Sequence, residues 1–318
     1  MALRNIACIG ECMVELVSAR NAPRLLERRF GGDTLNTCVY LARLLKSSSQ
    51  LHYVTRLGDD RFSRGMIEAW QREGIDCSMV ESAPGRLPGL YIIHTDPSGE
   101  RSFHYWRTEA PVRELFRSTG KELAARLAKF DVLYLTGITL AVLSEEGRTQ
   151  MVDLMESCRS AGGLVVYDTN HRTRLWSDPR DAVLWNSRAI QAAALILPSS
   201  DDLKLLFGED LETERWLDRL SHFGAREAVL KSGGEDAWIL NGQSRKKVAL
   251  ARIAAPVDTT GAGDSFNAGY MAARLSGSEP EDAVRFGHRL ASLVVMHRGA
   301  IIPSKAMGEL ASNTKAKA

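Results

Sequence analysis

The sequence has few cysteines, no marked excess of charge and no long hydrophobic run, and each shortage excludes a class of protein. Its five cysteines are odd in number and scattered, without a Cys-x-x-Cys pair, which argues against a disulfide framework and a zinc site. The 41 Lys and Arg against 39 Asp and Glu leave a net charge of +2, so we expect no nucleic-acid or membrane partner. The most apolar stretch, residues 132–143, is too short to cross a bilayer.

What is present is an ordinary globular composition, with 44% hydrophobic and 25% charged residues. The first ten residues lack the basic and apolar segments of a signal peptide, so we expect a soluble protein in the reducing cytoplasm. At about 150 residues per domain, the 318 residues could form two domains or one α/β domain with an appendage.

Short β-rich runs alternate with helix-length periodic segments along the chain. This alternation predicts an α/β fold, with a mostly parallel sheet covered by helices on both faces. The expected strands are residues 6–10, 51–57, 132–136, 164–168, 195–198, 228–231 and 238–240. The expected helices are residues 35–45, 62–73, 120–129, 144–161, 178–192, 200–207, 212–223, 263–276 and 281–295.

Two regions, at about residues 11–30 and 87–110, break this rhythm with short alternating patterns, and the second contains the turn Asp96-Pro97-Ser98-Gly99. Such patterns predict a small antiparallel sheet. Neither region can bury a core alone, so we expect residues 1–318 to form one domain with these two regions inserted as a lid.

The most informative segment is Asp258-Thr259-Thr260-Gly261-Ala262-Gly263-Asp264-Ser265-Phe266, which leads into a helix. Gly261, Ala262 and Gly263 would let backbone N–H groups crowd together at the positive end of the helix dipole and bind a phosphate. A carboxylate repels phosphate, so Asp264 is better explained as the base that takes a proton from an attacking hydroxyl. A helix cap is the alternative, but a cap accounts for only one of these acidic residues.

This segment resembles the carboxy-terminal signature of the ribokinase-like sugar kinases, the PfkB family, and residues 31–36 resemble that family's Gly-Gly-x-x-x-Asn substrate motif. The resemblance extends from Ile6 to about Pro303. It implies a three-layer α/β/α domain, an ATP-dependent kinase, Asp264 as the catalytic base and Gly261 to Gly263 as the anion hole.

Two arginines indicate which class of sugar the substrate belongs to. The planar fork of arginine matches a carboxylate, so Arg107 in the expected lid and Arg172 just past a strand end favour a sugar acid over a neutral sugar. A surface ion pair is the alternative for either one alone. Residues 10–16, 86–91, 103–107, 170–176 and 298–303 are similar to the 2-keto-3-deoxygluconate kinase branch of the family. That similarity implies phosphorylation of the 6-hydroxyl of 2-dehydro-3-deoxy-D-gluconate, with substrate contacts from Gly32, Asp33, Thr34, Leu35, Asn36, Tyr91, Tyr105, Arg107, Arg172 and Asp264.

The nucleotide site is expected after the strand at residues 228–231. The residues that the resemblance assigns to ATP are Asp168, Asn170, Lys231, Ser232, Gly233, Gly234, Asp236, Gly261, Ala262, Gly263 and His288. Taken alone, Gly234 would only mark a hairpin turn, and His288 would be a packing residue.

Mg²⁺ is the expected metal cofactor, although one motif departs from the family. Relatives commonly carry Asn-x-x-Glu where this chain has Ser199-Ser200-Asp201-Asp202. We therefore assign no direct protein ligand to Mg²⁺ and expect Asp202 to act through water. Asp258 and Thr260 match positions at which some members bind a monovalent cation such as K⁺.

Two other functions stay open at this point, a kinase for fructose, ribose or a nucleoside and a non-catalytic sugar sensor on the same fold. The complete 261–264 string argues against the sensor. An exposed lid sheet would have an edge and an apolar face to cover, so we expect a homodimer.

Overall fold

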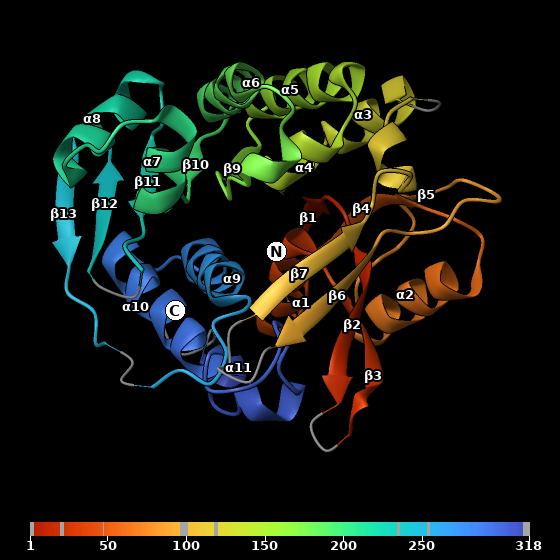
Figure 1. The fold of residues 1–318 in the computed structure, drawn as a ribbon. Coiled ribbons are helices and arrows are strands. Elements are labelled where there is room, and N and C mark those ends of the chain that lie inside the picture. Colours follow the sequence, from red (N-terminus) through yellow and green to blue (C-terminus); the bar gives the residue numbers. More distant parts are fainter. Residues whose placement is uncertain are drawn as a thin grey trace.

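The computed structural model describes residues 3–19, 22–46, 48–95, 101–117, 120–233, 236–252 and 255–313. Within them the chain forms two sheets, and the larger has the strand order β13-β12-β11-β10-β9-β8-β1-β4-β5 (Figure 1). Its strands are β1 (Arg4–Ile9), β4 (Ser49–Leu57), β5 (Val80–Ser82), β8 (Val132–Thr136), β9 (Leu164–Asp168), β10 (Leu195–Ile196), β11 (Glu227–Leu230), β12 (Ala237–Asn241) and β13 (Ser244–Val248).

The strands from β11 to β5 pair in parallel, and β12 and β13 extend the sheet by antiparallel pairing. After β1 the chain builds one side of the sheet with β4 and β5, and it then crosses to β8 and builds the other side. The strand order therefore reverses between β1 and β8. In open α/β sheets, ligands bind outside the carboxyl ends of the strands at such a point.

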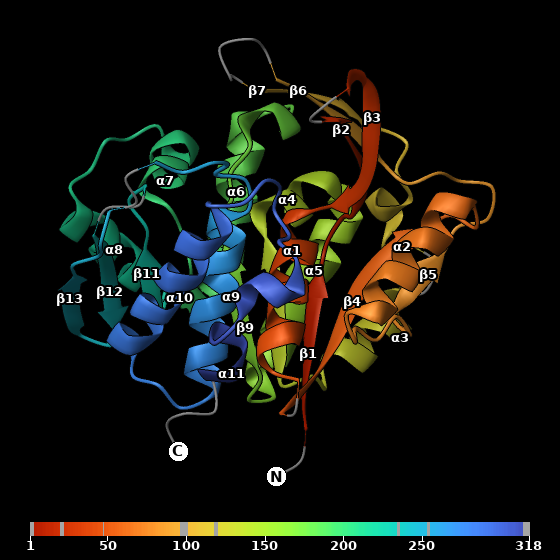
Figure 2. The same cartoon turned by 90° about the horizontal axis from the view of Figure 1, so that it is seen from below.

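Helices cover both faces of the large sheet, and side chains that alternate along β1 reach both cores. Ile6 and Cys8 pack with α1 (Asp33–Leu44), α2 (Arg61–Arg72), α9 (Ala262–Leu275) and α10 (Pro280–Val294). Ala7 and Ile9 pack with the opposite layer, formed by α3 (Gly120–Leu127), α4 (Gly137–Val142), α5 (Glu145–Ser160), α6 (Pro179–Ala192), α7 (Ser200–Phe207) and α8 (Thr213–His222). Figure 2 shows α1, α9 and α10 in front of the sheet and α4, α5 and α6 behind it. Short helical turns occur at Pro111–Glu114, Thr173–Leu175 and Ser304–Met307, and α11 (Leu310–Asn313) follows the last of them.

The small sheet consists of β3 (Ala22–Gly31), β2 (Met13–Ala19), β6 (Leu90–Thr95) and β7 (Arg101–Trp106), in that spatial order. Its outer pairs, β2 with β3 and β6 with β7, are antiparallel, and the central pair of β2 with β6 is parallel. The small sheet comes from two separate insertions, one between β1 and α1 and one after β5. It lies at one end of the molecule, beside the carboxyl ends of the large sheet's strands (Figure 2).

The predicted α/β class, the mostly parallel sheet and the small second sheet are confirmed. Most predicted elements are present with slightly different ends: residues 62–73 form α2 at Arg61–Arg72, and the strand expected at 195–198 is limited to Leu195–Ile196. No helix in the described ranges is both long and apolar enough to span a membrane.

Candidate active site

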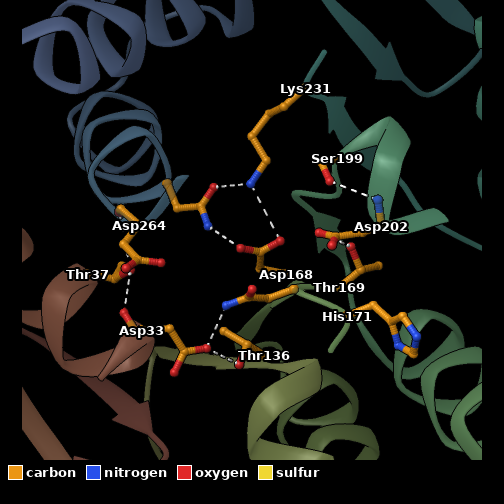
Figure 3. Close-up of polar contacts among 12 residues, drawn as sticks. Asp33, Thr37, Thr136, Asp168, Thr169, His171, Ser199, Asp202, Lys231 and Asp264 are labelled. Atoms are coloured by element: carbon orange, nitrogen blue, oxygen red, sulfur yellow. Dashed lines mark hydrogen bonds and ion pairs between the residues drawn. The ribbon is translucent and has the colours of Figure 1, made fainter. Parts of the chain in front are cut away.

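The first turn of α1 lies where β1 and β8 diverge. Gly32 precedes this helix in extended backbone, and a Cβ there would lie 2.1 Å from the Glu11 carbonyl oxygen, so no larger residue fits. Asp33, the first residue of α1, accepts hydrogen bonds from Thr136 Oγ1 at 2.5 Å and Asn170 Nδ2 at 2.8 Å (Figure 3). Because Thr136 ends β8 and Asn170 follows β9, Asp33 ties α1 to two strand ends. Burial raises the pKa of the Asp33 carboxyl.

The amino end of α9 faces the same place. Gly261 caps the helix with φ of 75°, a left-handed conformation that favours glycine, and a Cβ there would lie 2.8 Å from Ala300 Cα. Ala262 N–H donates to the Thr259 carbonyl at 3.2 Å. At Gly263, by contrast, no atom outside its chain neighbours and its own helix backbone lies within 4 Å of the point that a Cβ would occupy.

Asp264, in the first turn of α9, meets α1 directly. Its Oδ2 accepts a hydrogen bond from Asn36 Nδ2 at 2.8 Å, and its backbone carbonyl lies 3.2 Å from Thr37 Oγ1. Figure 3 shows Asp264 and Asp33 in neighbouring positions, from α9 and α1 respectively. Burial raises the pKa of Asp264 to about 8, with a further contribution from the negative charge of Asp33. A carboxyl with such a pKa can accept and return a proton near neutral pH.

A mostly buried hydrogen-bond network holds Lys231 near Asp264 and Asp33. Asn267, which is three residues after Asp264 on α9, donates from Nδ2 to Asp168 Oδ2 at 2.7 Å and accepts from Lys231 Nζ at 2.9 Å. The same Nδ2 lies 3.2 Å from the Tyr134 hydroxyl. Lys231 Nζ is also 3.5 Å from Asp168 Oδ1 (Figure 3). Asn267 is fully buried and was not predicted as a site residue, although its i+3 spacing puts it on the same helix face as Asp264.

The two arginines predicted to bind a carboxylate differ in their surroundings. Arg107 follows β7 and makes a buried ion pair through Nη2 with Glu11 Oε2, the two side chains being 10% and 3% exposed. Arg172 follows β9 with its side chain 57% exposed, and its Nη1 lies 3.7 Å from Asp202 Oδ1. Arg107 is therefore fixed and neutralised by a partner, whereas Arg172 is largely open to solvent.

The remaining residues predicted to bind the substrate have either buried or solvent-exposed side chains. Tyr91 is buried, and its hydroxyl donates to the buried Glu15 carboxylate in the small sheet. Tyr105 is 50% exposed, and its ring lies 5.6 Å from that of Tyr91. Thr34 Oγ1 is 3.1 Å from the Tyr53 hydroxyl and Leu35 is in the core, so only their backbone groups remain for a ligand.

The other residues predicted to bind the nucleotide follow Lys231 in the chain or lie on α10. Ser232 and Gly233 follow Lys231 directly, whereas Gly234 lies outside the described residues. Asp236 is 2.7 Å from Lys247 Nζ across the β12–β13 hairpin, and His288 Nε2 on α10 is 2.7 Å from the Ala251 carbonyl oxygen. Both side chains thus have structural partners.

The two segments considered for metal ions also have internal hydrogen bonds. Ser199 caps α7 by accepting from the Asp202 N–H at 3.0 Å. Burial, together with the charge of Asp168, raises the pKa of Asp202. Asp258 accepts from Thr260 N–H, Thr260 Oγ1 and Gly299 N–H, so its carboxylate joins the loop before α9 to residue 299. In the part of the chain described, no three His, Cys, Asp or Glu side chains gather as a metal site.

Gly263 without a close neighbour outside its own helix, the Asp264 carboxyl one residue further on and the mostly buried Lys231 gather at the carboxyl edge of an α/β sheet. Residues 3–307 match the model of the pfkB family carbohydrate kinases, and the chain belongs to that family. The resemblance inferred from residues 31–36 and 258–266 is therefore confirmed, and the chain is a sugar kinase, a phosphotransferase with an alcohol acceptor that uses ATP.

Individual proteins of known name are also similar to this chain. Two proteins named 2-dehydro-3-deoxygluconokinase, from Dickeya dadantii strain 3937 and Escherichia coli strain K12, are 42% and 41% identical to this chain, and each match covers 96% of this chain and 99% of the relative. The solved structure of a fructokinase with bound ATP from Xylella fastidiosa is similar with a TM-score of 0.82 at 20% identity, covering 97% of both chains. This structural similarity shows a shared fold.

Proposed function

We propose that the chain transfers the γ-phosphate of ATP to the 6-hydroxyl of 2-dehydro-3-deoxy-D-gluconate, giving 2-dehydro-3-deoxy-6-phospho-D-gluconate and ADP. The observation that carries the reaction type is Asp264, held by Asn36 at 2.8 Å in the first turn of α9 with its pKa raised to about 8. The names of the relatives at 42% and 41% identity support the substrate.

In this mechanism the Asp264 carboxylate accepts the proton of the 6-hydroxyl while the hydroxyl oxygen attacks the γ-phosphorus. The bond to the β,γ-bridging oxygen breaks, and ADP leaves with that electron pair. The backbone at Gly261, Ala262 and Gly263 stabilises the transferring group through the helix dipole and through the N–H donors of Gly261 and Gly263, since the Ala262 N–H already donates to the Thr259 carbonyl. No side chain or other element crowds Gly263. Lys231, fixed by Asn267 and Asp168, adds a positive charge on the nucleotide side.

The sugar acid is bound from two sides. Asp33 and Asn36 on α1 supply acceptors and donors for its hydroxyl groups, next to the Gly32 backbone. Arg107 and Arg172 bind its carboxylate, with Tyr91 and Tyr105 beside Arg107 in the small sheet. Arg107 Cζ lies 5.7 Å from the centre of the Tyr105 ring, so the aromatic face already supports the guanidinium.

Mg²⁺ fits the carboxylates at the nucleotide side. The Asp202 side chain is only 13% exposed, and burial together with the Asp168 charge raises its pKa, so a hydrated divalent cation nearby would favour the charged form of this carboxyl. Asp202 would then hold Mg²⁺ through water. When bound, the metal neutralises charge on the ATP phosphates. K⁺ near Asp258 and Thr260 is the second ion of the proposal, and omission of each ion from the assay tests it.

The small sheet is proposed as a lid that covers the sugar and as the contact between two copies in a homodimer. Its exposed apolar side chains support the second role: Leu25 is 65% exposed, Leu26 48% and Trp106 59%. Pairing of two such sheets would cover some of these side chains.

The experiment that tests the function is an ADP-release assay of the purified chain with ATP, Mg²⁺ and a panel of acceptors. We expect kcat/KM for 2-dehydro-3-deoxy-D-gluconate to exceed that for fructose, ribose and nucleosides by at least about a hundredfold, because a neutral sugar has no carboxylate to accept the hydrogen bonds that Arg107 and Arg172 still offer beside their protein partners. A higher kcat/KM for a neutral sugar would refute the substrate. No ADP release with any acceptor would refute the kinase.

A further inference from the structure

Glu11 is a buried acid to which the proposed function gives no role. It follows Gly10 at the carboxyl end of β1, and its side chain is 3% exposed. Its backbone carbonyl is the group that excludes a side chain at Gly32, and its Oε1 would lie 2.9 Å from a Cβ at Gly89. Glu11 therefore sits where β1, the start of α1 and the segment before β6 meet.

The partner of Glu11 is Arg107, at the end of the small sheet. The two residues are 96 positions apart in the chain, and their ion pair joins β1 to the end of β7. Burial raises the pKa of the Glu11 carboxyl, and the Arg107 charge opposes that rise. Since the arginine is 10% exposed, removal of its partner would leave a buried charge without compensation.

One N–H donor of the Arg107 guanidinium has no acceptor among the described residues. Glu11 takes the hydrogen bond of Nη2, whereas the buried Nε has no hydrogen-bond partner within the described residues. A buried donor without a partner costs free energy, so it marks a place where a ligand acceptor would be favourable. A guanidinium has five N–H donors, which lets it bind one carboxylate of the protein and another of a ligand at once.

We propose that Glu11 is a positioning residue for recognition of the substrate's carboxylate. By binding Nη2 it fixes the plane of the Arg107 guanidinium against the Tyr105 ring and leaves Nε–H free for the sugar acid. The Glu11 carboxylate also balances the positive charge of Arg107 within their ion pair. Selection of the sugar acid by Arg107 therefore depends on directed hydrogen bonds more than on net positive charge. The inference rests on the proposed function, because it requires an acidic substrate.

The test is a double-mutant cycle of Glu11→Gln and Arg107→Met, assayed with the sugar acid. Gln keeps an oxygen acceptor without the charge, and Met keeps apolar packing without donors. We expect Glu11→Gln to raise KM for the sugar acid about tenfold with kcat changed less than about twofold, and to have no further effect in the Arg107→Met background. The KM for ATP should stay unchanged in all three variants, which a general structural defect would not allow.

Two controls keep the outcome interpretable. Glu227→Gln removes a comparable ion pair, 2.7 Å from Arg274 Nη2 with side chains 15% and 28% exposed, and should leave KM unchanged. Glu11→Asp keeps the charge on a shorter arm and should give an intermediate KM, which replaces the Gln variant if that one does not fold. Equal effects of Glu11→Gln with and without Arg107 would overturn the inference, as would an unchanged KM. Failure of the wild-type chain to phosphorylate the sugar acid would refute the proposed function separately.

Discussion

The carboxyl edge of the large sheet and the small sheet fix their polar groups in different ways. At the edge, Asp168, Asn267 and Lys231 form one branched network in which Asn267 bonds both of the others. In the small sheet and where it joins β1 the contacts are single pairs, Tyr91 with Glu15 and Arg107 with Glu11. A branched network fixes the positions of several side chains together, as the transfer of a phosphoryl group requires. A separate pair can be changed by mutation without moving the other pair. We therefore expect changes at the edge to lower kcat or stability, and changes in the small sheet to alter KM.

The largest expected effect is on turnover when Asp264, the proposed base at the edge of the large sheet, is replaced. Asp264→Asn keeps the size of the side chain but cannot accept the hydroxyl proton, so kcat should fall about a thousandfold. Binding of ATP, followed by calorimetry, should stay within about threefold, since the backbone donors of α9 are intact. A kcat within tenfold of the wild type would remove Asp264 from the role of base and weaken the contrast between the two regions.

The second effect concerns pH. Below its pKa of about 8 the Asp264 carboxyl is protonated and cannot act as a base, so kcat/KM should fall roughly tenfold for each pH unit below 8. The profile is measured from pH 6 to 9 at saturating Mg²⁺ and subsaturating sugar acid. A flat profile over this range would contradict the assignment.

The same raised pKa has a consequence for stability. The folded state favours the protonated carboxyl, so from the ordinary Asp pKa of 3.8 upward the wild type loses stability until the pH passes about 8. Asp264→Asn carries no such cost. Its Tm should therefore exceed that of the wild type at pH 8, and the difference should shrink as the pH falls toward 4. A lower Tm for the variant at pH 8 would contradict the burial argument.

How much of the molecule could be predicted from the sequence depends on the range of the interactions involved. Periodicity found the buried strands and long helices, but β13 was missed because Ser244–Val248 is a mostly exposed edge strand with a polar pattern. The six-residue α4 was missed because both its environment and the strand before it are apolar, although Thr136 and Thr139 form a capping box at its start.

At the candidate site, the motifs predicted Asp33, Asn36 and Asp264, and the structure brings all three together, which leaves their roles a prediction. Asn267 could have been inferred from its place one helical turn after Asp264. The pairing of Glu11 with Arg107 could not, since no local pattern specifies which of many acids a distant arginine will meet.

The smallest expected effect compares stability in the two regions. Asn267→Leu leaves Asp168, Lys231 and Tyr134 without a shared partner in the core, so the free energy of unfolding should fall by about 2 to 3 kcal/mol. Glu15→Gln keeps an acceptor for the Tyr91 hydroxyl and should cost about 1 kcal/mol or less. Denaturant unfolding of both variants measures the difference.

A matched control for Asn267 lies outside the site. Asn186 on α6 is equally buried and also bonds on both sides, accepting from the Tyr167 hydroxyl at 2.6 Å and donating to the Ala182 carbonyl at 2.8 Å. Asn186→Leu should lose similar stability while kcat is retained at temperatures where the variant is folded, whereas Asn267→Leu should lose both because Lys231 is released. If the two variants kept the same kcat, the network around Asn267 would be structural only, and the edge of the large sheet would not differ from the rest of the core.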